Sequence, residues 1–486
     1  MQSELKERTR DGSIRSDGAY RGYDLRLQAS DNRPEALELL LTGPGTPMNE
    51  YFRRYWQPVC LSEQLTDVPK AIRILHEDLV AFRDRSGQVG VLHRRCAHRG
   101  TSLEFGIVSE HGIRCCYHGW LYDVDGTILE TPCEPADSRL KQTVCQGAYP
   151  AFERHGLVFA YLGPPDTQPK FEMFDGYVLP EGTKLVPFSN EFACNWLQVY
   201  ENLIDHYHTA MLHNNMTVEG VDAALAAGAS FSGGWTELPV IHWEATHGGN
   251  GIIFTAGRRV SDTKVWVRIS ELGFPNWAQN ASLAPSAARQ RHTSVAMTRW
   301  QVPVDDANSI AFGWRHFNDE VDPDHVGCVA DCGVDKIDFL IGQTRHRSYD
   351  EQQRVPGDYE AITSQGADGV AIHQLEHPGR SDVGVYMCRS LLRDALRGKA
   401  APDPTRLLSE ADPGDTLPRY PSDTVLEVPR LGDADADRQL ISETASKVLA
   451  VLKEAEVLSS AERRKHVLRR LDEIDGGLRP DGESRK

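Results

Sequence analysis

The sequence has few cysteines, and their arrangement argues against a disulfide-stabilised secreted domain. Only ten occur in 486 residues, and they lack the regular spacing of a disulfide framework. The N-terminal stretch MQSELKERTRDGSIRSDG is polar and contains no apolar core of a signal peptide. Without a secretory signal, we expect a cytoplasmic protein whose thiols stay reduced.

Long apolar runs and an excess of basic residues are also absent. No apolar stretch approaches the ~18 residues that a membrane-spanning helix needs, so we expect no membrane association. The formal net charge is −17, whereas nucleic acid phosphates are bound by basic faces, so we expect no nucleic acid partner. No Gly-x-Gly-x-x-Gly follows a strand within a βαβ unit, so no nicotinamide or flavin site is predicted in this chain.

The sequence does contain two pairs of metal-ligand residues. Cys96-x-His98 and Cys115-x-x-His118 are separated by 16 residues, and each pair brings one thiolate and one imidazole to a loop. Two Cys and two His suit either tetrahedral zinc or a Rieske [2Fe–2S] cluster, in which two His replace two Cys on one iron. A zinc finger usually takes both Cys from one end of its motif and both His from the other, so the mixed pairs favour the cluster.

A second group of polar residues lies in the apolar segment Asn195–His213. Asp205 precedes His208 by three residues, His213 follows it by five, and Asn202 lies one turn earlier. We expect a mostly buried helix with some polar groups facing inward. Inward ionisable groups are costly and need a reason, and a metal is one, because two His and one carboxylate on one face of an iron leave positions open for O2 and a substrate. A single buried His is more often a packing residue, so the argument rests on the whole set.

Together the two motifs resemble those of the Rieske non-haem iron ring-hydroxylating oxygenases, in the phthalate-dioxygenase-like branch of their alpha, or terminal oxygenase, subunits. The resemblance covers roughly residues 42–395 and is carried by Cys96-x-His98-Arg99-Gly100, Cys115-x-Tyr117-His118-Gly119-Trp120 and Glu201-Asn202-x-x-Asp205-x-x-His208-x-x-x-x-His213. It implies a Rieske [2Fe–2S] cluster on the four residues of the Cys/His pairs. It also implies a mononuclear Fe(II) on His208 and His213.

The resemblance further implies a third iron ligand, a carboxylate far down the chain, and the alignment gives Asp358. Asp358 has an alternative role as the cap of a helix that opens at Tyr359, after a Pro-Gly turn. Three other carboxylates are near enough in sequence to compete for the iron: Glu360, Asp350 and Asp368.

The resemblance also implies how the two centres are connected. In the family, the Asp at the position of Asp205 joins an iron-ligand His to a cluster His of the next subunit. We therefore expect Asp205 to link His208 to His118 of the partner subunit, and we take Asp205 and Asn202 as the candidate catalytic residues. Such a route works only in an oligomer, and the family implies a homotrimer or a hexamer made of two stacked trimers.

The predicted fold class is α+β. We expect an all-β Rieske domain and a catalytic domain with a curved antiparallel sheet flanked by helices, similar to a helix-grip fold. Four regions follow along the chain: an N-terminal arm and turn at 1–47, the Rieske domain at 48–165, the catalytic mononuclear iron domain at 166–400, and a linker with a C-terminal helical extension at 401–486.

The predicted function is that of a terminal oxygenase component. Electrons from a separate NAD(P)H-dependent reductase or ferredoxin enter at the cluster and pass to the iron, and oxygen from O2 is inserted into an aromatic substrate, by the resemblance an aromatic acid or ether. Dihydroxylation, monohydroxylation and O-demethylation all stay open. The rival hypothesis is a Rieske-type electron-transfer protein or a zinc-binding module without oxygenase activity, and metal content separates the three.

Overall fold

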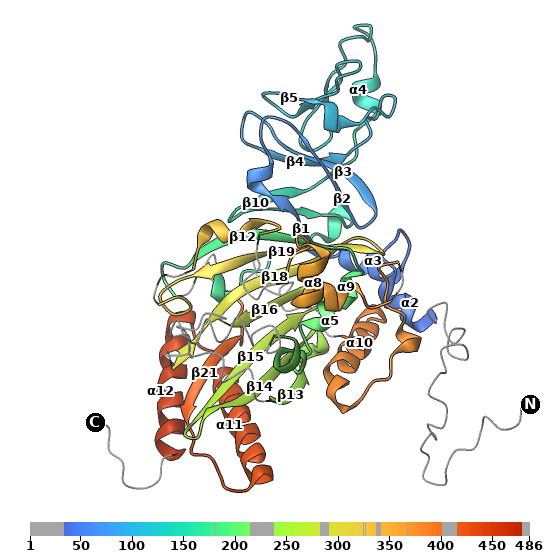
Figure 1. The fold of residues 1–486 in the computed structure, drawn as a ribbon. Helices are drawn as coiled ribbons and strands as arrows, with labels where there is room; N and C mark the ends of the chain where they lie inside the picture. Colours follow the sequence, from blue (N-terminus) through green and yellow to red (C-terminus); the bar gives the residue numbers. More distant parts are fainter. Residues whose placement is uncertain are drawn as a thin grey trace, which may run out of the picture.

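The computed structural model describes residues 34–478 except 179, 214–237, 282–290, 324, 326, 337–341, 367 and 401–415. A smaller, β-rich part stands on one edge of a second part that is built around a large sheet (Figure 1). This agrees with the predicted combination of an all-β domain and a sheet-plus-helix domain. Most of the predicted N-terminal arm, and part of the predicted linker, lie outside the described residues. None of the described helices is long and apolar enough to cross a membrane.

The smaller part contains three sheets of short antiparallel strands. Residues of β3 (Glu77–Arg83) alternate between two cores, because Leu79 and Ala81 pack with the large sheet's core while Val80 and Phe82 pack around the Cys/His loops. The strand orders are β1-β11-β10, β2-β3-β4-β9 and β5-β6-β7-β8. The strands are β1 (Trp56–Leu61), β2 (Lys70–Ile74), β4 (Val89–His93), β5 (Ile107–Val108), β6 (Ile113–Arg114), β7 (Leu121–Tyr122), β8 (Ile128–Glu130), β9 (Ala148–Tyr149), β10 (Ala151–Arg154) and β11 (Leu157–Tyr161).

The large sheet has the order β13-β14-β15-β16-β18-β19-β12-β20, and β21 pairs with β15 and β17. All of its pairings are antiparallel except that of β12 with β20, so the sheet is mixed rather than purely antiparallel as predicted. Its strands are β12 (Lys184–Phe192), β13 (Val240–Ala245), β14 (Gly251–Ser261), β15 (Lys264–Gly273), β16 (Trp277–Ala281), β17 (His292–Thr293), β18 (Val295–Asp305), β19 (Asn308–Phe317), β20 (Gly333–Val334) and β21 (Ser422–Glu427).

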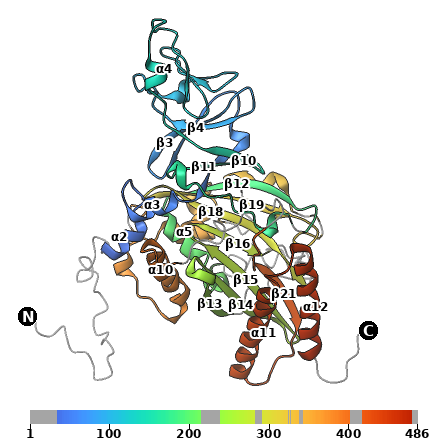
Figure 2. The ribbon, with the colours of Figure 1, turned by 180° about the vertical axis from the view of Figure 1, so that it is seen from behind.

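Helices cover both faces of this sheet, which explains why β14 and β15 are buried along almost their whole length. One face carries α5 (Trp196–Asn202) and α10 (Val383–Leu396), and the other carries α11 (Ala434–Glu454) with α12 (Ser460–Leu478) beside it (Figures 1 and 2). Shorter described helices are α2 (Pro34–Leu40), α3 (Pro47–Phe52), α4 (Leu140–Thr143), α8 (Tyr349–Arg354) and α9 (Asp358–Thr363).

The segment Asn195–His213 is not the single helix that its apolar pattern predicts. Helix α5 starts at its cap Asn195, whose side chain accepts the backbone N–H of Leu197, and ends at Asn202. Residues 203–207 are not helical, and a second helical stretch begins at residue 208. The break has a local cause, because the Asp205 carboxylate accepts the backbone N–H groups of Tyr207, at 2.8 Å, and of His208, at 3.4 Å.

Candidate metal centres

The first candidate centre brings both Cys/His pairs together. Cys96 and Cys115 are buried, whereas His98 and His118 are only half-buried, and their ring centroids lie 4.5 Å apart. Burial raises the pKa of the Cys115 thiol, and the adjacent Cys96 thiol raises it further. Both loops adjoin the sheet β5–β8, in the half of the smaller part that is remote from the large sheet (Figure 1).

The two loops have the same geometry. The backbone N–H of Gly100 donates to the carbonyl of Cys96 at 2.8 Å, and that of Gly119 donates to the carbonyl of Cys115 at 3.1 Å. Both glycines have a positive φ, near 75°, where other residues are strained. Each glycine therefore lets the chain turn back tightly, so that the Cys and the His of its pair face the same point.

The neighbours of the four residues complete the site. The Tyr122 hydroxyl lies 2.9 Å from Cys96 Sγ, and the indole of Trp120 stacks on the His98 ring at a centroid distance of 4.6 Å and an interplanar angle of 4°. The neighbouring Cys116 is exposed. Two buried thiols with two imidazoles on their outer side fit a Rieske cluster, which two Cys and two His would hold.

The second candidate centre consists of His208, His213 and Asp358. Ligand atoms of all three lie within 4.8 Å of one another, although Asp358 is about 150 residues away from the two histidines in sequence. Asp358 approaches His208 Nε2 and His213 Nε2 with one oxygen each, both at 3.5 Å. Two imidazoles and one carboxylate on one side of a point fit the donor set of a mononuclear non-haem iron.

Two amides orient the Asp358 carboxylate. The side chain of Gln343 donates to one oxygen at 2.7 Å, and that of Asn202 donates to the other at 3.3 Å. Asn202 therefore lies behind a candidate ligand, where it fixes the carboxylate for the metal. Sequence reasoning missed Gln343, because an isolated glutamine outside any motif carries no local signal.

The competing carboxylates have other partners or positions. Glu360 pairs with Arg347 and caps the backbone N–H of Gly357, Asp350 pairs with Arg354 on the surface, and Asp368 is exposed. The cap of α9 is Gly357, so Asp358 is the first residue of the helix rather than its cap. Among the described residues, Asp358 is thus the carboxylate that the fold brings to both histidines.

The charges at this centre stabilise one another. Burial opposes ionisation of Asp358, but the nearby His213 and His208 outweigh it and lower its pKa. Burial also opposes protonation of His208, but the Asp205 carboxylate beside the ring and the charge of Asp358 outweigh it and raise the pKa of His208. Burial lowers the pKa of His213. A divalent cation bound between these groups would take the place of the protons on the imidazoles.

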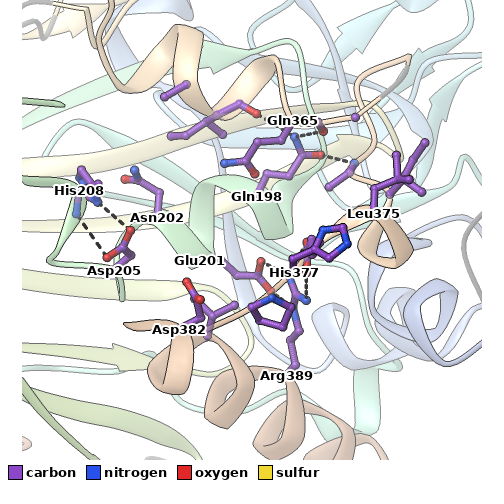
Figure 3. A pocket seen from close by; sticks show the side chains of 18 of the residues that line it. Gln198, Glu201, Asn202, Asp205, His208, Gln365, Leu375, His377, Asp382 and Arg389 are labelled. Carbon is purple, nitrogen blue, oxygen red and sulfur yellow. Dashed lines mark hydrogen bonds and ion pairs between the residues drawn. The ribbon is translucent and has the colours of Figure 1, made fainter. Parts of the chain in front are cut away.

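Asp205 lies on the outer side of the His208 ring. Its carboxylate is 3.5 Å from His208 Nδ1, so it contacts the edge of the ring that faces away from Asp358. Figure 3 shows Asp205, His208 and Asn202 at one end of a cavity of about 480 Å³. At the other end, Arg389 forms paired hydrogen bonds with the carboxylates of Glu201 and Glu376. The Asp205 side chain is 35% exposed, so it can be reached from outside this chain.

Comparison with known proteins decides the family. Residues 55–149 match the model of the Rieske [2Fe-2S] domain. The tert-butanol monooxygenase / tert-amyl alcohol desaturase oxygenase subunit of Aquincola tertiaricarbonis is 68% identical over 460 residues, which are 95% of this chain and 97% of that protein. This chain belongs to the Rieske non-haem iron oxygenases. It is an oxygenase subunit, whose cofactors are a Rieske [2Fe–2S] cluster and a mononuclear iron, and the rival hypothesis of a carrier or zinc module is set aside.

Two further comparisons agree with this family. The phenoxybenzoate dioxygenase subunit alpha of Ectopseudomonas oleovorans is 37% identical over 373 residues, which are 74% of this chain and 84% of that protein. The crystal structure of dicamba monooxygenase bound to 3,6-dichlorosalicylic acid has a TM-score of 0.51 and 18% identity, and covers 72% of this chain and 99% of that one. At this identity the structural match shows the fold of a Rieske oxygenase and nothing about the substrate.

Proposed function

We propose that this Rieske oxygenase holds its cluster on Cys96, His98, Cys115 and His118 and its iron on His208, His213 and Asp358. The observation that supports the iron site best is the meeting of three ligand side chains from two distant segments, with Gln343 and Asn202 behind the carboxylate. When bound, the iron supplies positions at which O2 is activated beside the substrate. The chain's residues orient the ligands, with Asn202 and Gln343 fixing Asp358 and Asp205 fixing His208.

We propose a small aliphatic tertiary alcohol as the substrate. Support comes from the relative named for tert-butanol and tert-amyl alcohol, which is 68% identical over almost the full length, whereas the relative named for phenoxybenzoate is 37% identical. In the monooxygenase reaction, R–H, O2, two protons and two electrons give R–OH and water. One oxygen atom enters the C–H bond and the other leaves as water, so the two electrons must come from outside the chain.

The aromatic acid or ether predicted from sequence is the second candidate, and Arg299 favours the acid. On β18, Trp300 packs edge-on against Phe159 of the smaller part, so the preceding Arg299 points to the opposite face, where α5 lies. There the charge of Asp358 acts on its guanidinium, and burial lowers the pKa of Arg299 to about 10. A guanidinium beside the iron site is suited to hold a substrate carboxylate.

We propose that electrons reach Asp205 from the cluster of another protomer in a homotrimer or hexamer. The cavity at Asp205 is lined by four carboxylates, those of Glu201, Asp205, Glu376 and Asp382, and one guanidinium. The cluster end carries Arg99 close to the exposed ring of Tyr117, beside His118. These opposite charges support docking of His118 of the partner subunit near Asp205.

The remaining proposals concern partners and organisation. A separate NAD(P)H-dependent reductase or ferredoxin supplies the electrons in this proposal. Residues 48–165 receive them, residues 166–400 carry out the oxygenation, residues 1–47 are an N-terminal arm and turn, and residues 401–486 are a linker and a C-terminal helical extension. We propose the cytosol as the compartment, where the eight cysteines other than Cys96 and Cys115 stay reduced.

Metal content and substrate coupling test these proposals. Iron and acid-labile sulfide are measured in the purified chain, and about three irons and two sulfides per chain are expected. The reduced protein is then supplied with a compatible reductase, NADH and O2, and product formed per O2 consumed is compared for tert-butanol and phenoxybenzoate. Tight coupling with tert-butanol alone supports the alcohol, coupling with phenoxybenzoate alone transfers the assignment to the aromatic acid, and zinc without sulfide contradicts both metal sites.

A further inference from the structure

Two consecutive arginines of β14 point to opposite faces of the large sheet, and both are buried. Arg259 faces α11, where its guanidinium pairs with the carboxylate of Asp437. Arg258 faces the iron site, where its Nη2 donates to Thr209 Oγ1 at 2.6 Å and to the carbonyl of His206 at 3.2 Å. Two adjacent residues of β14 therefore supply one contact to the segment that carries His208 and one comparable contact on the opposite face of the sheet.

The groups that Arg258 holds flank the candidate ligand His208. Thr209 Oγ1 also donates to the carbonyl of His206 at 2.6 Å, so hydroxyl, carbonyl and guanidinium form one closed set of hydrogen bonds around residues 206–209. On the other side of this turn, the Asp205 carboxylate accepts the N–H groups of Tyr207 and His208. The backbone that presents His208 is thus fixed from two directions.

Arg258 is in turn connected to the C-terminal strand. It lies opposite Trp266 across β14 and β15, with its guanidinium 5.5 Å from the indole. Trp266 Nε1 donates to Oδ1 of Asp423 on β21 at 2.8 Å. Arg268 lies 4.8 Å from the same indole and donates to both oxygens of Asp423, at 2.9 and 2.8 Å.

This arrangement places two guanidinium groups beside one carboxylate in a buried environment. Buried charges of like sign repel, so a carboxylate beside them stabilises both. Asp423 pairs with Arg268 and fixes the indole of Trp266, against which Arg258 packs. A change at Asp423 therefore disturbs the packing of Arg258, and Arg258 contacts the turn of His208 directly.

We propose that Asp423 and Arg258 are positioning residues for the mononuclear iron, with Asp423 acting through Trp266 and Arg258 acting on the turn that presents His208. The inference rests on the proposed ligand set of His208, His213 and Asp358. It assigns part of the C-terminal extension to the iron site, although β21 is about 210 residues away from His208 in sequence.

Substitutions at Thr209 are the mildest test, because one removes the hydroxyl at constant side-chain volume and the other keeps the hydroxyl. Thr209→Val removes the acceptor of Arg258 and keeps the volume, whereas Thr209→Ser keeps the hydroxyl. The readout is the dissociation constant of Fe(II), titrated into holo-cluster protein from which only the mononuclear iron has been removed. We expect Thr209→Val to weaken Fe(II) binding about 10-fold or more, and Thr209→Ser to stay within about twofold of wild type.

The neighbouring residues Arg258 and Arg259 provide a test variant and its matched control. Arg258→Met and Arg259→Met each remove a buried guanidinium from β14, on opposite faces, so both lower the melting temperature. We expect only Arg258→Met, together with Asp423→Asn, to weaken Fe(II) binding and to lower the product formed per O2. Equal Fe(II) affinity in Thr209→Val, Thr209→Ser and wild type overturns the proposal, as does a loss in Arg259→Met as large as in Arg258→Met.

A separate variant keeps this test apart from the assignment of the iron site. His213→Ala must abolish the Fe(II) site in the same titration if the ligand set is right. Retained binding in His213→Ala contradicts the proposed function itself. Loss in His213→Ala with unchanged binding in Thr209→Val contradicts only the positioning role.

Discussion

The carboxylate of Asp205 lies 3.5 Å from Nδ1 of His208, on the ring edge opposite the one that faces Asp358. One imidazole thus contacts a carboxylate on each side, one inside the iron site and one at the cavity. A carboxylate behind a metal-bound imidazole fixes the ring orientation and its tautomer. In this protein the same carboxylate also orders the turn before His208, so it acts on the ring and on the backbone together.

Replacing Asp205 with Asn should keep both metals and slow electron transfer severely. The amide preserves the shape and still accepts a backbone N–H, but it loses the charge that stabilises the His208 ring. In the presence of substrate and O2, we expect the cluster of the reduced protein to be reoxidised about 10- to 100-fold more slowly than in wild type. Stopped-flow absorbance of the cluster measures this rate, with iron and sulfide content checked in the same sample.

A charge change elsewhere on the protein is the control for that variant. Asp394→Asn removes a carboxylate on the surface of α10, where it pairs with Lys399, and should leave the rate unchanged. Normal turnover in Asp205→Asn would remove the bridging role from the proposal.

Replacing Asp358 with Asn should empty the mononuclear site and spare the cluster. The neutral amide cannot supply the anionic ligand, and Gln343 would then face a second amide. We expect iron to fall from about three to about two per chain with sulfide unchanged, as measured by elemental analysis. Glu360→Gln, whose carboxylate pairs with Arg347 instead, should keep all the iron, and a loss there equal to that of Asp358→Asn would speak for a different ligand.

Replacing Tyr122 with Phe should lower the reduction potential of the cluster. The hydroxyl lies 2.9 Å from Cys96 Sγ, and donation to a ligand sulfur stabilises the reduced, more negative cluster. A differential hydrogen bond of about 1 kcal/mol corresponds to a shift of about 40 mV for one electron. Redox titration followed by electron paramagnetic resonance measures it, and an unchanged potential with an intact cluster spectrum would show that the hydroxyl does not donate to the bound cluster.

Acid should destabilise the protein in part through His316, which is buried on β19. Burial lowers its pKa to about 3, whereas an unfolded histidine titrates near 6.5. The unfolded state therefore binds more protons below pH 6.5, so this contribution to stability is present above pH 6.5 and is lost as the pH falls. Between pH 6.5 and 5 the loss is about 2 kcal/mol.

Denaturant unfolding at pH 7.5 and pH 5 measures this contribution. The amide of His316→Gln can keep the contact of the ring Nε2 with the Thr298 hydroxyl, which lies at 3.0 Å, and it does not titrate. We expect the difference in unfolding free energy between the two pH values to shrink in this variant and to persist in a variant of the exposed His111, His111→Gln. A variant of His316 as sensitive to acid as wild type would be inconsistent with a neutral buried ring.

The parts of the two centres that sequence could predict are those with short-range spacing. Cys96 and His98, or His208 and His213, lie within a few residues of each other, so one loop or one turn of helix fixes their relation. Gln343 and Arg258 reach the iron site only through strand order and loop closure over long distances in the chain, and neither has a motif around it. The apolar periodicity continues across the break in the helix before His208, so it does not predict the break. The break follows from the Asp205 carboxylate, which accepts the backbone N–H of Tyr207.

The edge of β15 is shared by two strands, since β16 pairs with its last residues and β21 with its first. β21 is synthesised after every candidate ligand of the two centres, which lie between Cys96 and Asp358. During translation the other strands of the large sheet are therefore made while the first residues of β15, among them Trp266 and Arg268, still lack β21. The contacts of Asp423 with Trp266 and Arg268 can form only after all the candidate ligands of both centres have been synthesised.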